Sequence, residues 1–154
     1  MRPQDIINKS DNRSKERAKK QAISAKFYKV ENNSIMYTVN SAEGNKQYLV
    51  VIQLLDLTGN KLQSLRSALN GNIKISCTCP AFLYQGYKYI TFKGKYGINK
   101  ETRPPVKTNP EQNGAACKHI LVALEQIKSD YQIIHNAVKT QLPKGKDKPQ
   151  PTDI

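Results

Sequence analysis

Cysteine, histidine and acidic side chains are all scarce in this sequence, and long apolar runs are missing. The chain has three cysteines and two histidines, and 12 Asp and Glu stand against 25 Lys and Arg. An odd number of cysteines does not suit a framework of disulfides. Because there is neither a long apolar stretch nor a secretory signal, we expect no membrane span and an intracellular origin.

Signatures of catalysis are missing as well. The sequence has no Ser-His-Asp arrangement, no Gly-rich phosphate loop and no paired carboxylates. We therefore predict that the protein is not an enzyme and takes no small-molecule substrate. The formal net charge of +13 instead favours an acidic partner such as nucleic acid.

All three cysteines and one histidine fall in two short segments, with Cys77 and Cys79 in the first and Cys117 and His119 in the second. Residues 72–76 alternate polar and apolar, which predicts a strand, and positions i and i+2 share one face of a strand. The second pair opens an apolar-periodic helix, whose positive end favours a thiolate. The four side chains make a complete tetrahedral donor set for zinc. No position is left for water or substrate, so we predict a structural metal.

Three other interpretations of these residues remain open. One disulfide and a free thiol are possible, although Cys77 and Cys79 lie too close on a strand to bridge each other comfortably. The cysteines could also be unrelated buried thiols. A nucleophilic Cys117 assisted by His119 requires a shared ion or an irregular first turn, because positions i and i+2 of a helix diverge by about 200°.

The cysteine pattern resembles that of the SWIM family of zinc-binding modules, C-x-C followed by C-x-H on a ββα unit. Here Cys77 and Cys79 are separated from Cys117 and His119 by 37 residues. The local sequences Ser-Cys-Thr-Cys-Pro-Ala-Phe and Cys-Lys-His-Ile are also similar to those of SWIM-like proteins of tailed bacteriophages. The resemblance covers residues 72–128, and it implies structural zinc and a role in binding DNA or proteins.

The rest of the pattern predicts an α+β fold with a small antiparallel sheet. Residues 27–30 and 35–39 flank a turn-forming cluster and predict a hairpin. A second turn at 42–45 leads into a mostly aliphatic strand from 48 to 55, which we expect at the centre of the sheet. Leucines at helical spacing predict a short helix over 62–69, with a strand as the alternative.

We expect three parts along the chain. Residues 1–25 form a basic arm, extended or helical, and residues 26–140 form the zinc-stabilised domain. Within that domain a spacer, residues 80–116, connects the two ligand pairs. Residues 141–154 form a tail of disordered composition.

The arm is strongly basic, because residues 1–30 carry nine Lys and Arg against three acidic residues. With few apolar residues before Ile23, we expect it to lie outside the fold as a solvated helix or a segment that orders on a partner. Its cations either raise solubility or contact phosphates or an acidic protein. The candidate contacts are Arg13, Lys15, Arg17, Lys19 and Lys20.

The spacer concentrates aromatic residues. Those at helical spacing predict one face of a helix that begins after Pro80 and packs on the sheet, namely Phe82, Tyr89, Phe92 and Tyr96. The others are expected at the surface, where they form either a protein interface or a basic aromatic surface for stacking bases. The candidate contacts there and in the following loop are Tyr84, Tyr87, Lys88, Lys93, Arg103 and Lys107.

The C-terminal part predicts one long amphipathic helix. Its apolar stripe is formed by Ile120, Leu124, Ile127, Tyr131, Ile134 and Val138. A single sheet covers about half of this length, so we expect the outer part to meet another subunit. His135 lies about 160° around the helix from His119 and is predicted to be an ordinary surface residue.

Taken together, these features favour a non-enzymatic, zinc-stabilised structural or adaptor component of a large assembly. Its partners are other subunits, and the resemblance to phage proteins implies a virion or a phage nucleoprotein complex. The expected location is therefore the virion or the host cytoplasm. The alternative is a free-standing DNA- or RNA-binding accessory protein that uses the basic arm and the spacer.

Overall fold

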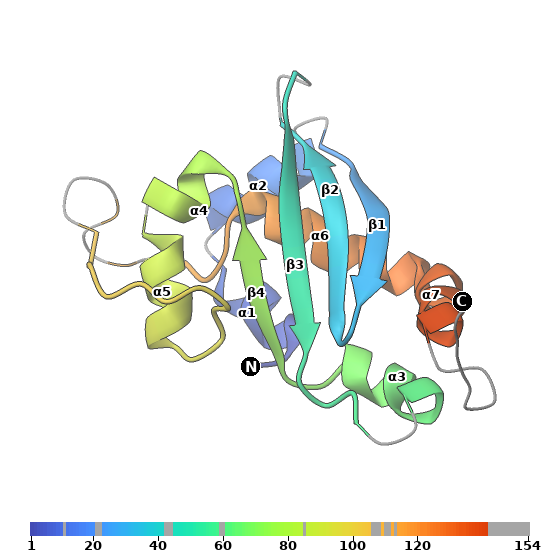
Figure 1. Ribbon diagram of the computed structural model, residues 1–154. Helices are drawn as coiled ribbons and strands as arrows, with labels where there is room; N and C mark the ends of the chain where they lie inside the picture. Colours follow the sequence, from blue (N-terminus) through green and yellow to red (C-terminus); the bar gives the residue numbers. More distant parts are fainter. Residues whose placement is uncertain are drawn as a thin grey trace, which may run out of the picture.

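The computed structural model describes residues 1–10, 12–20, 23–41, 45–58, 61–84, 86–105, 109, 112 and 114–141. Within them the fold is α+β, as predicted, with a four-stranded sheet (Figure 1). The elements in chain order are α1 (Pro3–Lys9), α2 (Asn12–Lys20), β1 (Ala25–Glu31), β2 (Ser34–Asn40), β3 (Gln47–Leu54), α3 (Lys61–Leu69), β4 (Ile73–Cys77), α4 (Pro80–Tyr84), α5 (Tyr87–Lys93), α6 (Lys118–Ser129) and α7 (Tyr131–Gln141).

The sheet is a simple antiparallel meander in the order β1-β2-β3-β4. The predicted hairpin is confirmed, and its turn places Asn32 in the left-handed region at φ 56°, which asparagine tolerates. The aliphatic strand β3 is an inner strand, as expected. The predicted turn at 42–45 falls mostly outside the described residues.

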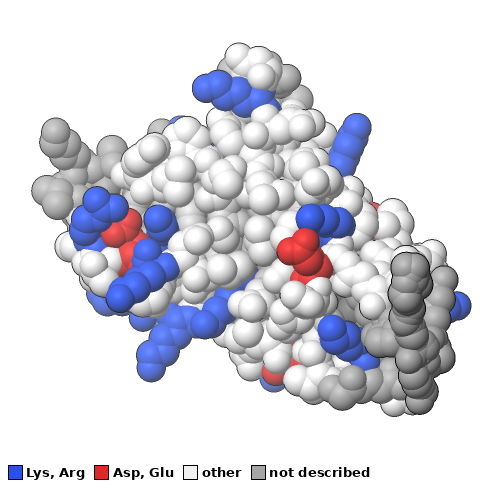
Figure 2. Space-filling view, in the orientation of Figure 1, with Lys and Arg blue, Asp and Glu red and all other residues white. Residues whose placement is uncertain are grey.

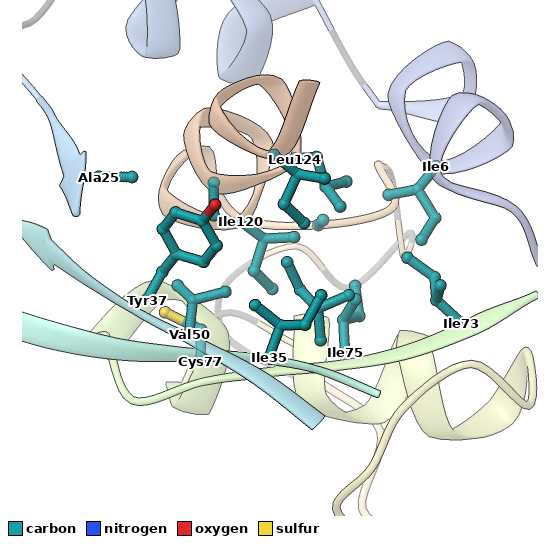
Figure 3. Packing of buried hydrophobic residues seen from close by; sticks show 14 of the residues in the cluster. Ile6, Ala25, Ile35, Tyr37, Val50, Ile73, Ile75, Cys77, Ile120 and Leu124 are labelled. Atoms are coloured by element: carbon teal, nitrogen blue, oxygen red, sulfur yellow. The ribbon is translucent and has the colours of Figure 1, made fainter. Parts of the chain in front are cut away.

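Alternating burial shows which face of the sheet carries the core. In β2 the residues Ile35, Tyr37 and Val39 are buried, while their neighbours are half-buried. The buried side chains point toward α6, which crosses behind the sheet and contacts all four strands (Figures 1 and 3). The opposite face carries no helix in the part of the chain that the structure describes.

The N-terminal arm differs from the expectation, because α1 and α2 are packed parts of the fold. Ile6 is completely buried and points into the core (Figure 3). The backbone N–H of Ile73 donates to the carbonyl of Met1 over 2.8 Å, and α2 packs along α6. Ile6 does not act alone, because Met1, Ile7 and Ala18 also pack against the core. These few apolar side chains anchor a segment whose composition is otherwise that of a solvated arm. Deleting residues 1–22 would therefore remove part of the core.

The C-terminal segment also differs, because it forms two helices that meet at Asp130. The buried Asp130 carboxylate accepts hydrogen bonds from the Tyr37 hydroxyl over 2.7 Å and from the Gln126 amide over 3.0 Å. After this break α7 changes direction and packs on α3 and β1. Ile134 and Val138 are thus buried within their own chain, and the expectation that they meet another subunit is wrong.

The spacer forms two short helices in place of one. Gly86 has a positive φ of 94°, a conformation that glycine adopts without steric cost, and it separates α4 from α5. The break resets the helical register. Tyr87 is therefore buried, against the expectation of a surface residue, while Phe92 is 37% exposed instead of packed. Phe82 and Tyr96 are buried as predicted.

After α5 the chain returns to the edge of the sheet. The N–H of Ile75 donates to the carbonyl of Tyr96 over 2.8 Å, and the N–H of Ile98 donates to the carbonyl of Ile75 over 3.0 Å. This short pairing with β4 is parallel. It covers part of an edge that would otherwise expose unpaired backbone groups.

The buried position of Ile6 leads to a first prediction. Ile6→Ala should lower the free energy of unfolding by about 2–5 kcal/mol, since it leaves a cavity in the core. Urea unfolding followed by circular dichroism measures the change. Asn8→Ala, at an exposed position of the same helix, is the control and should shift stability by less than about 0.5 kcal/mol. Equal stabilities for the two variants would show that the N-terminal segment does not contribute to the core.

Candidate metal centre

The first ligand pair is placed by the end of β4. Ile73, Ile75 and Cys77 alternate toward the buried face of this strand. Beyond the strand, Thr78 stays paired with β3: its N–H donates to the carbonyl of Leu49 over 3.1 Å, and its hydroxyl accepts from the Leu49 N–H over 3.0 Å. The strand register thus continues for one more residue, which brings Cys79 to the same side as Cys77.

The second pair is placed by the start of α6. Cys117 is the N-cap residue, with extended backbone angles of φ −75° and ψ 162°, and His119 lies in the first turn. Because Cys117 is not yet helical, the two side chains do not diverge as they would inside a helix. The chain reaches this point past Ala115, whose carbonyl accepts a hydrogen bond of 2.9 Å from the Tyr96 hydroxyl.

The four predicted ligands come together. One donor atom from each of Cys77, Cys79, Cys117 and His119 lies within 4.8 Å of the others, and all four side chains are buried. A tetrahedral zinc ion with Zn–S bonds of 2.3 Å separates its sulfur ligands by about 3.8 Å. The three cysteines are free of disulfides. The disulfide alternative is therefore wrong, and the thiols form one cluster.

The polar groups around the cluster fit a metal ion. Both ring nitrogens of His119 are buried without a hydrogen-bond partner, which is costly unless one of them binds a metal. The sulfur of Cys77 accepts a contact of 3.4 Å from the Cys79 N–H, and the sulfur of Cys79 accepts one of 3.3 Å from the Phe82 N–H. Backbone donors of this kind stabilise thiolates, the form of cysteine that binds zinc.

The thiols also influence one another. The hydrogen bonds from Cys117 and then from Cys77 lower the pKa of Cys79, while burial raises the pKa of Cys117. A divalent cation stabilises the thiolate form of all three sulfurs, since the charged ligands then surround a positive centre.

The centre is closed and joins separate parts of the chain. Four protein donors complete the preferred coordination of zinc, which is typical of structural sites. The ion connects the end of β4, the entry to α4 and the start of α6. Cys117 is only 1% exposed, which does not favour its use as a nucleophile. In the close-up of the core, Cys77 lies beside Val50, at the edge of the apolar cluster (Figure 3).

The remaining candidate contacts are not gathered at this centre. In α2, Lys15 is partly buried and Arg17 is exposed. The side chains of Arg13, Lys19 and Lys20 lie outside the described residues, and so does Lys107.

The spacer candidates fall in different environments. Tyr84, Lys93 and Arg103 are exposed, Lys88 is half-buried, and Tyr87 is buried beside the Ser14 hydroxyl at 3.3 Å. His135 is outside the metal cluster, as predicted, but it is half-buried rather than on the surface, with its ring 5.8 Å from that of Tyr131.

None of the helices in the described part of the chain has the length and apolar character needed to span a bilayer.

The sequence analysis did not single out two residues that position candidate site residues, Glu101 beside Arg103 and Thr78 before Cys79. Glu101 forms an ion pair with Arg103, and the Glu-Thr-Arg spacing was the available signal. Thr78 fixes the approach to Cys79, and no local pattern indicated its pairing across the sheet.

A buried Cys3His centre that joins the end of a strand to the start of a helix defines a structural zinc module. The family model of the SWIM zinc finger matches residues 55–89 and 111–128. These two segments contain all four ligands, so this part of the chain is similar to the SWIM zinc finger. The comparison with curated proteins found no match, and the comparison with solved structures found none either.

The metal centre gives a second prediction. The purified protein should contain about one zinc per chain, and Cys79→Ser or His119→Ala should remove it. Both variants should unfold at a much lower temperature, because binding energy at a structural site is folding energy. Elemental analysis and thermal unfolding measure the two effects.

The control is His135→Asn, which changes the histidine outside the cluster. This variant should retain zinc at the level of the unaltered protein. A Cys79→Ser variant that loses zinc but unfolds at the original temperature would show that the ion does not support the fold.

Proposed function

We propose that the protein is a non-enzymatic adaptor, folded around structural zinc, that joins a larger protein assembly through the open face of its sheet. The observation that carries this proposal is the chemistry of that face. The strand register brings Met36, Val51 and Ser76 side by side across the three strands β2, β3 and β4. All three side chains are half-buried, as expected of the uncovered face of a sheet.

The middle of this face is uncharged. Leu49 lies on β3 opposite Thr38, and together with Met36 and Val51 these residues form a continuous patch, which we call the sheet patch. Figure 2 shows this region in white, with the charged side chains toward its margins. A patch with an uncharged centre and a charged rim is typical of a protein interface.

The rim of the sheet patch is mainly basic and belongs to the edge strands. On β1, Lys26 and Lys29 pair with Thr38 and Met36, respectively, so they share the outer face with the patch. On β4, Lys74 pairs with Gln53. This arrangement favours a protein partner with an apolar strip and acidic residues around it, because opposite charges at a rim speed association and fix orientation.

The closed metal centre supports a binding role over a catalytic one. Its four donors are protein side chains, so a bound ion has no ligand position for a substrate. The assembly that we propose is a phage particle or nucleoprotein complex, and this part of the proposal rests only on the resemblance of the two cysteine segments to SWIM-like phage proteins in sequence.

A second candidate function is binding of DNA or RNA as an accessory protein. It is favoured by the basic excess of the spacer, where residues 80–116 carry six Lys and Arg against two acidic residues. The spacer lies beside β4, away from the centre of the sheet patch (Figure 1). One chain can therefore use both surfaces.

The adaptor function is tested by a charge placed in the sheet patch. Val51→Glu should abolish co-sedimentation of the protein with high-molecular-weight material in a gradient of lysate from its source, while zinc content stays unchanged. Ile133→Glu, on an exposed apolar residue of α7, is the matched control and should co-sediment normally. The proposal fails if Val51→Glu still co-sediments, or if the unaltered protein sediments only as a free chain.

A further inference from the structure

A groove outside the metal centre lies between the two spacer helices and the loop that follows them. It has a volume of about 540 Å³, within the range of ligand-binding clefts. Tyrosines and cations line it together with two prolines. The residues used here are Tyr84, Lys88, Tyr89, Arg103, Pro104 and Pro105.

The loop wall of the groove is held against the helices. A Cβ atom at Gly86 would lie 2.6 Å from the Pro105 ring, so the absence of a side chain at Gly86 permits this close approach. The Arg103 guanidinium donates to the two Glu101 carboxylate oxygens over 2.9 and 3.1 Å. This pairing lowers the pKa of Glu101 to about 2, so the carboxylate stays ionised at neutral pH and orients Arg103.

The helix wall presents aromatic surface to solvent. Tyr84 is 75% exposed, more than any other large apolar side chain in the described part of the chain. The neighbouring Tyr89 is half-buried, and the Lys93 ammonium lies 5.9 Å from the centre of its ring. Rings bordered by cations bind planar, electron-rich groups by stacking and anionic groups by charge.

Charge around the groove is predominantly positive. Figure 2 shows Lys and Arg side chains gathered over this part of the molecule around a smaller acidic group. Lys88 and Arg103 line the groove itself. Lys93 is exposed beside Tyr89. The only carboxylate among the described lining residues, that of Glu101, is paired with Arg103.

We propose that this groove binds single-stranded nucleic acid. An unpaired base stacks on Tyr84, and the adjoining phosphates contact Lys88 and the exposed edge of Arg103. A duplex keeps its bases stacked on each other and offers none to Tyr84, so single strands are preferred. This inference rests on the nucleic-acid-binding function proposed above and assigns that function to a site distinct from the sheet patch.

The experiment uses the zinc-loaded full chain and fluorescently labelled oligo(dT) and oligo(U) of about 15 nucleotides, a length suited to such sites. Anisotropy titrations should show binding that weakens as salt is raised. Tyr84→Ala should weaken it about 5- to 150-fold, the effect of losing one stacked base. Lys88→Gln should also weaken binding and reduce the salt slope by about 0.7, the effect of one lost phosphate contact on a single strand.

Matched controls replace the same residue types outside the groove. Tyr28→Ala, at a tyrosine that is 57% exposed on β1, and Lys26→Gln should leave the affinity within about twofold of the unaltered protein. All variants should keep their zinc, which shows that they are folded.

Three results would overturn the inference, and they are distinguishable. If neither oligonucleotide binds the unaltered protein at low salt, the nucleic-acid function itself fails. If they bind but Tyr84→Ala and Tyr28→Ala behave alike, nucleic acid binds elsewhere and only the groove is excluded. If a labelled poly-glutamate peptide binds as tightly as the oligonucleotides, with the same dependence on Tyr84, the groove serves an acidic protein segment. A difference between oligo(dT) and oligo(U) tells which nucleic acid the groove prefers.

Discussion

The structure depends on the coordination of one ion by residues from two distant stretches of the chain. Cys77 and Cys79 follow β4, whereas Cys117 and His119 begin α6, with 37 residues between the pairs. Closing a segment of this length costs conformational entropy, and the buried side chains in its described part, mainly Phe82, Tyr87 and Tyr96, offset that cost only in part. Zinc ties both ends at one point. The remaining freedom of the spacer is limited by the edge pairing of β4 and by the contact between Gly86 and Pro105.

This constraint links the metal to the two surfaces proposed for binding. The sheet patch lies on the outer face of strands whose inner face packs on α6, and α6 begins at the metal. The groove is built from the spacer, whose two ends meet at the same ion. Loss of zinc would therefore disturb both surfaces without any ligand contacting the metal. That arrangement suits an ion with a structural role.

Much of the fold was predictable because its signals are local. Alternation of polar and apolar residues predicted the strands, and the ligand set followed from the spacing of four residues. The helix break at Asp130 was not predictable, since the apolar stripe continues across it. At the break, the Asp130 carboxylate accepts a hydrogen bond from the hydroxyl of Tyr37, a residue 93 positions away.

The packing of the N-terminal segment was not predictable either, for a different reason. Its composition is that of a solvated arm, and its few inward apolar residues, Ile6 with Met1, Ile7 and Ala18, give little periodic signal among charged neighbours. In the spacer, the sequence does carry a signal for the observed structure. Gly86 interrupts the aromatic pattern, and resetting the register after it would have exchanged the predicted positions of Tyr87 and Phe92.

The central claim is that the ion holds the fold together. Its most direct test is equilibrium unfolding of the intact chain in urea, with and without a chelator that removes zinc, followed by circular dichroism. The account predicts a cooperative transition with zinc and, after chelation, a large loss of stability that added zinc restores. A chelated chain that unfolds at the same urea concentration as the zinc-loaded one would contradict it.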